Sequence, residues 1–190
     1  MAVGEYALTS LRNVKDYYGK SGSDVNDDRL LELLINKYSV LFETKIDKNI
    51  VSREYTEYLD GRGLSVLFPI QYPIISISGI WDSFAWTWDD STLIAATNYR
   101  IADNNRIVFK NTILSDNVQN VKMVYTAGYA TVPEDLELAC INEVVRAYKR
   151  RKENDVQSKS LSDGSVSYVS TDFLKQTKVV LYKYGFKGAF

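Results

Sequence analysis

Residues 124–141 read VYTAGYATVPEDLELACI, and this stretch decides the fold because a strand passes into a helix within a few residues. The run Val121 to Thr126 has the β-prone composition of a strand. Thr131 and Glu134 have the spacing of a capping box, with Pro133 in the first turn of the helix. The pattern predicts a strand joined closely to a helix over residues 133–152.

Two further helices are expected near the start of the chain. Thr9 as a capping residue and Gly19 as a stop predict a helix over residues 10–18. Apolar residues at three- and four-residue steps predict a longer helix over residues 27–47. A short polar link joins the two, which favours an antiparallel helical hairpin.

Residues 51–126 change to β-type patterns. The turn at residues 60–63, Asp-Gly-Arg-Gly between two β-prone runs, predicts a hairpin. Ile75 and Ile77 alternate with serines, as in a half-buried strand, and residues 99–109 predict a second hairpin. With the strand near residue 121 these segments indicate a small antiparallel sheet or a partial barrel.

The expected fold class is α+β, mainly helical. The N-terminal helical hairpin and the long C-terminal helix are expected to pack with a small antiparallel β-sheet or hairpin subdomain in a body of residues 1–152. Residues 153–190 are expected to be a linker and a C-terminal arm, because ENDVQSKSLSDGS lacks apolar periodicity. Within the arm, SVSYVS predicts a short strand and TDFLKQTKVVLYKYGF a helix capped by Thr171 or Asp172.

Composition points to a soluble globular protein. Of 190 residues, 45% are apolar and 25% are charged. No run approaches the roughly 20 apolar residues that cross a bilayer, and the start of the chain has no signal-peptide pattern. The protein is therefore expected neither to span a membrane nor to be secreted. The single cysteine, Cys140, falls in the apolar pattern of a helix and is interpreted as a buried structural thiol.

Charge divides unevenly along the chain. Residues 1–145 carry 13 Lys+Arg and 20 Asp+Glu, whereas residues 146–190 carry 10 Lys+Arg and 4 Asp+Glu. A basic tail on an acidic body can bind an acidic partner surface, bind nucleic acid, or fold back onto its own neighbours. The basic run Arg146 to Lys152 likewise fits either a phosphate backbone or a solvated helix end.

The residues offer little for catalysis. The chain has no histidine, the commonest general base and a common metal ligand, and no Gly-rich phosphate loop or nucleophile elbow. Three carboxylate pairs stand out: Asp27/Asp28, Asp89/Asp90 and Glu134/Asp135. Because the first and third lie in first turns of expected helices and the second in a turn, each has a structural explanation. We expect no enzyme activity, no cofactor and no metal.

An aromatic cluster, WDSFAWTW at residues 81–88, is the most unusual local feature. Trp81, Phe84, Trp86 and Trp88 lie within eight residues. They can pack within the chain, anchor a subunit contact, or bind a ligand. The last reading gives the alternative function, a carbohydrate- or surface-binding module that uses Trp81, Trp86 and Trp88.

Several segments carry a resemblance to a known family. The chain over residues 6–152, and most specifically LFPIQYPIISISGIWD and YTAGYATVPEDLELAC, resembles the head-to-tail connector (adaptor, head completion) proteins of long-tailed double-stranded DNA phages. It departs from the family pattern in the aromatic insertion at residues 84–90 and after Ser160.

The resemblance implies a non-enzymatic virion protein that forms a ring, usually of twelve copies, at the phage neck. The implied partners are copies of itself, the portal protein, a tail completion or stopper protein, and genomic double-stranded DNA that passes through the channel without sequence-specific binding. The implied location is the host cytoplasm during assembly and the virion neck afterwards, with no membrane contact. The candidate subunit or portal interface residues are Trp81, Trp86, Trp88, Arg146, Arg150, Arg151, Tyr168, Phe173, Leu174, Tyr182 and Tyr184.

Overall fold

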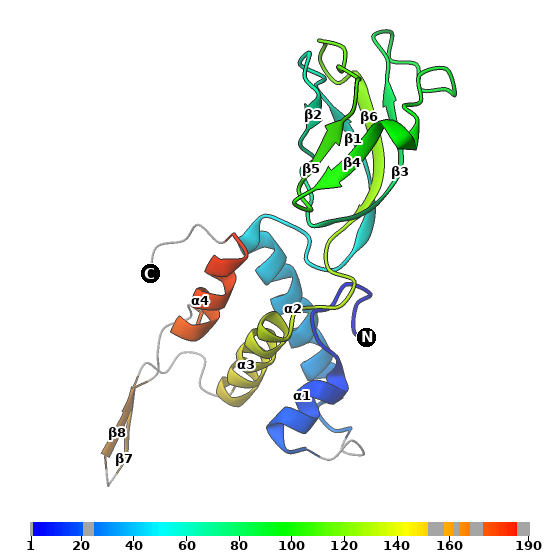
Figure 1. Ribbon diagram of the computed structural model, residues 1–190. Helices are drawn as coiled ribbons and strands as arrows, with labels where there is room; N and C mark the ends of the chain where they lie inside the picture. Colours follow the sequence, from blue (N-terminus) through cyan, green and yellow to red (C-terminus); the bar gives the residue numbers. More distant parts are fainter. Residues whose placement is uncertain (1, 21–24, 152–157, 162–163, 168–172, 186–190) are drawn as a thin grey trace. The chain divides into compact units, whose positions relative to one another are not determined.

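The computed structural model describes residues 2–20, 25–151, 158–161, 164–167 and 173–185 (Figure 1). Its helices are α1 (Leu11–Tyr18), α2 (Asp28–Ile46), α3 (Glu134–Arg150) and α4 (Lys175–Lys183), with a short 3-10 turn at Ala96–Asn98. Its strands are β1 (Arg53–Leu59), β2 (Val66–Leu67), β3 (Ile74–Asp82), β4 (Tyr99–Ala102), β5 (Arg106–Phe109), β6 (Val121–Ala127), β7 (Ser158–Leu161) and β8 (Gly164–Ser167).

The chain forms two compact units. Unit 1 is Met1–Asp47 with Val132–Phe190, and unit 2 is Lys48–Thr131. Unit 1 therefore holds all four described helices, and unit 2 is built from strands β1 to β6. The division into a body of residues 1–152 and an arm of residues 153–190 concerns the assembled state and stays a prediction.

In unit 1, helices α1, α2 and α3 lie where the sequence patterns placed them, with ends that differ by one or two residues. The cap of α1 is Ser10 rather than Thr9, because the Ser10 hydroxyl accepts the Asn13 N–H at 3.1 Å. Thr9 instead donates to Glu137 of α3 at 2.9 Å. Gly19 ends the helix in the left-handed region, with φ of 76°, as expected.

The capping box expected at the start of α3 is wrong. Pro133 is the N-cap residue instead of Thr131, so the helix begins two residues later than the box requires and has no side-chain cap. The acidic residues of this first turn instead bind neighbouring helices. Glu137 accepts a hydrogen bond from Asn13 of α1 at 2.7 Å. Asp135 accepts hydrogen bonds from Lys183 at 2.8 Å and Tyr184 at 2.7 Å, at the end of α4. The described cap of α4 is Leu174, and the residues 171–172 expected to cap it lie outside the described ranges.

Unit 2 consists of two three-stranded antiparallel sheets, ordered β1-β6-β3 and β2-β5-β4 (Figure 1). Both sheets supply one shared core, which includes Leu67, Ile74, Ile80, Ile107, Phe109, Leu114, Val121, Met123, Tyr125 and Ala127. The chain is 35% helix and 23% strand, so the α+β class holds but the expectation of a mainly helical chain is not confirmed. The reason is that the regular structure of unit 2 consists of strands, apart from the 3-10 turn at Ala96–Asn98.

Pairing in unit 2 differs from the sequence prediction at one turn. Arg62 and Gly63 do adopt positive φ, at 54° and 62°, but β1 pairs with β6 and β2 pairs with β5, so residues 60–63 change sheets instead of closing a hairpin. The expected alternation of β3 is also broken, because register shifts near its start leave Ile75 exposed. The second hairpin is confirmed, since β4 and β5 pair directly.

The end of β6 explains the glycine in the quoted stretch. Gly128 has φ of 109°, and a Cβ there would lie 2.8 Å from the Ser52 backbone. The Gly128 N–H donates to the Pro73 carbonyl at 2.9 Å. A larger residue is therefore excluded both by conformation and by space.

Asn120 joins three loops at one end of unit 2. Its side chain is fully buried, accepts the Gly61 N–H at 2.8 Å, and donates to Asp82 at 2.8 Å and to the Ser115 carbonyl at 3.0 Å. Its backbone carbonyl accepts the Ser83 N–H at 2.9 Å. Gly61 is required at this contact, because a Cβ would collide with the Ser115 carbonyl oxygen.

We expect Asn120→Ala to lower the free energy of unfolding of unit 2 by about 2–3 kcal/mol. The substitution removes the buried hydrogen bonds to Gly61, Asp82 and Ser115, and leaves the Gly61 N–H only its longer contact of 3.3 Å with the Asn117 carbonyl. Urea unfolding followed by tryptophan fluorescence measures this unit alone, since all three tryptophans belong to it. The matched control is Asn98→Ala at an exposed position, expected within about 0.5 kcal/mol of wild type. Equal effects of the two substitutions would contradict this role of Asn120.

Cys140 is buried in α3, as its apolar surroundings in the sequence indicated. Burial raises the pKa of its thiol to about 12, although a hydrogen bond with Ser39 opposes the shift. We expect no reaction with a maleimide in the folded protein at pH 8, because the reactive thiolate is nearly absent and inaccessible. Mass spectrometry before and after denaturation checks this, and rapid labelling of the folded chain would contradict it.

Candidate assembly surfaces

A basic hollow lies between α2 and α3 in unit 1. Its volume is about 310 Å³, and its lining is Leu30, Leu34, Lys37, Tyr38, Arg146, Ala147, Arg150 and Arg151. Helical periodicity produces it, because residues three and four apart share one face of each helix. The lining carries four basic side chains and no carboxylate, above an apolar floor. Such a surface attracts an anionic group that also presents apolar area.

Carboxylates beside the hollow hold its arginines in place. Arg146 forms an ion pair of 2.6 Å with the fully buried Glu143. Arg151 stacks on the Tyr148 ring, 3.9 Å from its centroid, and lies 3.9 Å from Asp27. Asp27 also accepts from the Tyr148 hydroxyl and from Lys20, and these hydrogen bonds lower the pKa of Asp27 below its usual range. Part of the basic tail thus folds back onto its own neighbours.

The structure brings three candidate residues, Arg146, Arg150 and Arg151, to this one hollow. Lys37 and the α2 leucines were missed by the sequence reasoning. The signal was present, since residues 30, 34, 37 and 38 have helical spacing, but that face was interpreted only as core.

The remaining candidates of unit 1 are used differently. Phe173 is buried, with its ring centroid 5.4 Å from that of Phe42. The Leu174 N–H donates to Glu143 at 2.8 Å, and Tyr184 is bonded to Asp135, so both hold α4 on α3. Tyr182 is exposed. Tyr168 lies outside the described residues.

An aromatic knob projects from unit 2, formed by Phe84, Trp86 and Val118. Their side chains are 70%, 54% and 65% exposed. Trp86 has φ of 55°, and its indole N–H donates to the Val118 carbonyl at 3.0 Å. Asn117 also donates to the Phe84 carbonyl, at 3.3 Å. These hydrogen bonds join the two loops that carry the exposed apolar side chains.

Trp81 and Trp88 pack within unit 2. The Trp81 ring lies against Gly79, and the Lys122 ammonium is 4.9 Å from its centroid. Trp88 contacts Tyr58, with centroids 4.9 Å apart. A sugar-binding platform needs neighbouring exposed rings, whereas these two rings are half-buried. Two of the four aromatic residues thus pack within the chain, whereas Phe84 and Trp86 are presented to solvent.

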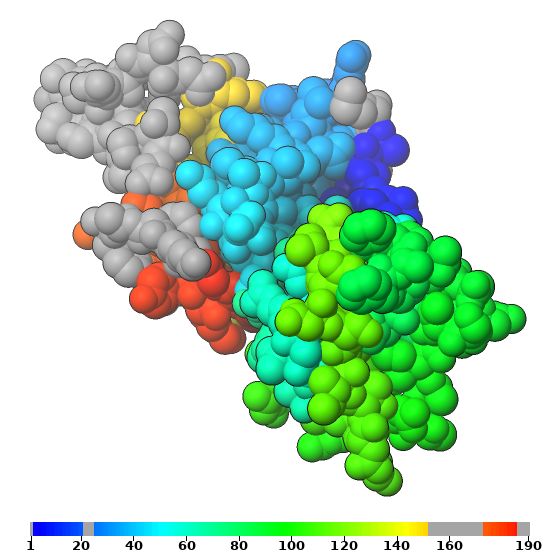
Figure 2. Space-filling view, turned by 90° about the horizontal axis from the view of Figure 1, so that it is seen from above, coloured from blue at the N-terminus to red at the C-terminus, as the bar shows by residue number. Residues whose placement is uncertain are grey.

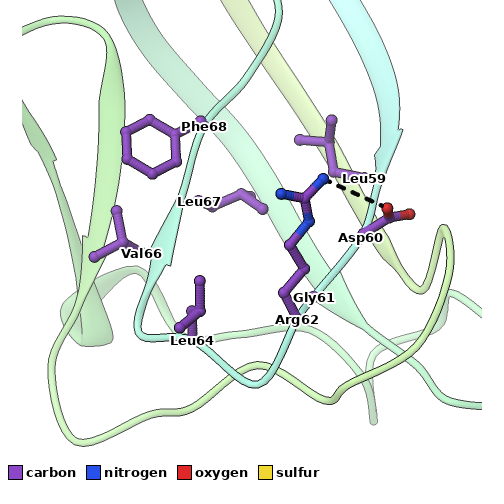
Figure 3. A pocket seen from close by; sticks show the side chains of 8 residues that line it. All are labelled: Leu59, Asp60, Gly61, Arg62, Leu64, Val66, Leu67 and Phe68. Atoms are coloured by element: carbon purple, nitrogen blue, oxygen red, sulfur yellow. Dashed lines mark ion pairs between the residues drawn. The ribbon is translucent and has the colours of Figure 1, made fainter.

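An apolar hollow of about 200 Å³ opens in the same unit. Its lining is Leu59, Asp60, Gly61, Arg62, Leu64, Val66, Leu67 and Phe68 (Figure 3). Figure 3 shows Arg62 extending along the hollow, with its guanidinium 3.8 Å from Asp60, while Leu67 and Phe68 come from the following segment. Sequence reasoning missed this site because it interpreted residues 60–63 as a hairpin turn.

Two classes of site have no support in the described part of the chain. Those residues contain no group of three His, Cys, Asp or Glu side chains placed to hold a metal ion. Within the same ranges, no helix combines the length and the apolar character needed to cross a membrane.

Comparison with solved structures finds the same fold in three assemblies of gene transfer agents. A chain from the neck of an empty particle, computed with C6 symmetry, matches with a TM-score of 0.64 at 18% identity, covering 100% of this chain and 95% of that one. A chain from a native virion matches with a TM-score of 0.63 at 15% identity, covering 96% of this chain and 92% of that one. A chain from a native neck, computed with C12 symmetry, matches with a TM-score of 0.62 at 17% identity, covering 100% of this chain and 94% of that one.

Curated protein sequences give no match to this chain. The head completion protein family, in contrast, matches residues 7–185. The match covers both compact units, including the aromatic knob and the two hollows. The chain therefore belongs to the head completion protein family and is a structural, non-enzymatic protein of phage particles.

Proposed function

We propose that copies of this chain form a ring at the neck of a phage particle, where the ring joins the portal of the DNA-filled head to the tail and continues the DNA channel. The observation that carries the proposal is the fold of the whole chain, which matches subunits of necks computed with sixfold and twelvefold symmetry. We propose twelve copies, in keeping with the twelvefold neck.

The surfaces of the subunit fit such a role. A ring is built from heterologous contacts, in which one face of each subunit meets a different face of the next. Unit 1 offers a basic hollow, and unit 2 offers an aromatic knob and an apolar hollow. Such surfaces suit the binding of other proteins by complementary shape and charge, and this binding involves no catalysed reaction.

The basic hollow is the surface we assign to the portal protein, through an acidic segment of that partner. Four basic side chains line the hollow with no carboxylate among them, and its leucines provide apolar contact area. Charge complementarity of this kind favours rapid and selective docking. The tail completion or stopper protein then binds elsewhere on the ring, and genomic DNA passes without sequence-specific contacts.

The test is Lys37→Glu combined with Arg150→Glu in a phage that depends on this chain. We expect at least a tenfold loss of infectious particles and an accumulation of filled heads without tails, because the two charge reversals repel an acidic segment. Plaque titre and electron microscopy of purified particles provide the measurement.

The matched control is Lys45→Glu, an exposed charge reversal on the same helix α2. It is expected to assemble normally. The portal assignment is wrong if the double variant joins heads to tails at the wild-type level, and the ring proposal itself is wrong if the wild-type protein is absent from finished particles.

A further inference from the structure

We propose that neighbouring copies in the ring are joined by inserting one aromatic ring of the knob of one copy, that of Trp86, into the apolar hollow of the next. This inference rests on the proposed ring and names the contact that closes it. The knob is Phe84, Trp86 and Val118, and the hollow is the site lined by residues 59–68.

The knob has the properties of a binding anchor. A left-handed backbone is rare for a bulky residue such as Trp86, and it is held here by a specific hydrogen bond to Val118. The result is an indole presented to water beside the exposed Phe84 ring. Tryptophan anchors of this kind dominate many protein interfaces, and exposed apolar patches mark such interfaces.

The size of the hollow selects its occupant. A cavity of roughly 150 Å³ lined by apolar side chains is large enough to bind benzene, so a hollow of about 200 Å³ accepts one aromatic ring. It is too small for a helix or a strand. Leu64 and Phe68 at the hollow are 50% and 61% exposed, which leaves apolar area for a ring to cover.

The placement of knob and hollow suits a head-to-tail contact. In Figure 1, β2 lies on one side of unit 2, and β3, which leads into the knob loop, lies on the other. Figure 2 shows the surface of the same unit, with its segments coloured by residue number. The two patches adjoin, because the Asn117 carbonyl accepts the Gly61 N–H at 3.3 Å and the Gln119 N–H donates to Asp60 at 2.9 Å, on either side of Val118. Two different, complementary patches join a copy to two neighbours, whereas a two-fold dimer would use one self-complementary patch.

A shared frame fixes the angle between the two patches. Asn120 accepts the Gly61 N–H at the hollow and, through its carbonyl, the Ser83 N–H at the base of the knob loop. Asp82 adds a second link, since it accepts from Asn120 and from the Ser115 N–H at 2.8 Å. Each subunit therefore repeats the same rotation, which a closed ring requires.

Charges around the two patches are complementary. The exposed Asp89 and Asp90 follow the knob, and the Arg62 side chain at the hollow is 73% exposed. The Ser91 hydroxyl and N–H both donate to Asp89, which lowers the pKa of that carboxyl. Docking the knob thus brings an acidic loop toward a basic side chain of the next copy.

Cysteine cross-linking in purified particles tests the contact. Ala85→Cys lies between Phe84 and Trp86, and Ser65→Cys lies between lining residues of the hollow, both at exposed positions. With a short bis-maleimide we expect a ladder of covalent oligomers from the double variant, and monomers from each single variant. The native Cys140 is buried and gives little background.

A charge exchange gives a second measurement. We expect Arg62→Asp and Asp90→Arg each to reduce the yield of tailed particles at least tenfold, and the double variant to recover most of that loss. Arg100→Asp, an exposed reversal in the same unit, is the matched control and is expected to have little effect. Recovery by the double variant requires the two positions to meet, which a purely structural role of either residue would not produce.

The outcomes separate the two proposals. Absence of the protein from particles overturns the ring and this contact together. Its presence without cross-links between positions 65 and 85 overturns the contact alone. Self-linking of Ala85→Cys shows a symmetric pairing of knobs, and linking of Ala85→Cys to a different virion protein shows another occupant of the knob; either result also overturns the contact.

Discussion

The buried amide of Asn120 is the constraint on which the working end of unit 2 depends. It satisfies Gly61, Asp82 and Ser115 at once, and no water is needed to complete these hydrogen bonds. An unmet polar group in this position would carry a large desolvation cost. Because the partners lie in three separate segments of the chain, one side chain ties these segments together.

In unit 1, ion pairs join segments that are distant in the sequence. The chain is acidic over residues 1–145 and basic beyond, yet opposite charges meet in space, as Asp27 meets Arg151 and Asp135 meets Lys183. Glu143 is fully buried because Arg146 and the Leu174 N–H both satisfy it. The charge asymmetry is thus partly used to pack the helices, and two arginines of the basic hollow, Arg146 and Arg151, take part in this pairing.

A head completion protein needs surfaces of defined shape at defined angles. The described residues supply these with exposed apolar side chains on stiff loops and a basic hollow between helices. Neither feature requires a reactive group, in keeping with the family to which the chain belongs. In the ring that we propose, every subunit has to make the same turn.

The sequence by itself determined the helices, the strand-to-helix junction, the second hairpin, the buried Cys140 and the family, because periodicity and local turn chemistry act over a few residues. It did not determine that β1 pairs with β6, that Trp81 and Trp88 are covered while Trp86 is exposed, or that Lys37 joins Arg150 in one hollow. Only the tertiary structure decided these, since strand partners and surface neighbours are chosen by packing between distant segments, which local patterns do not encode.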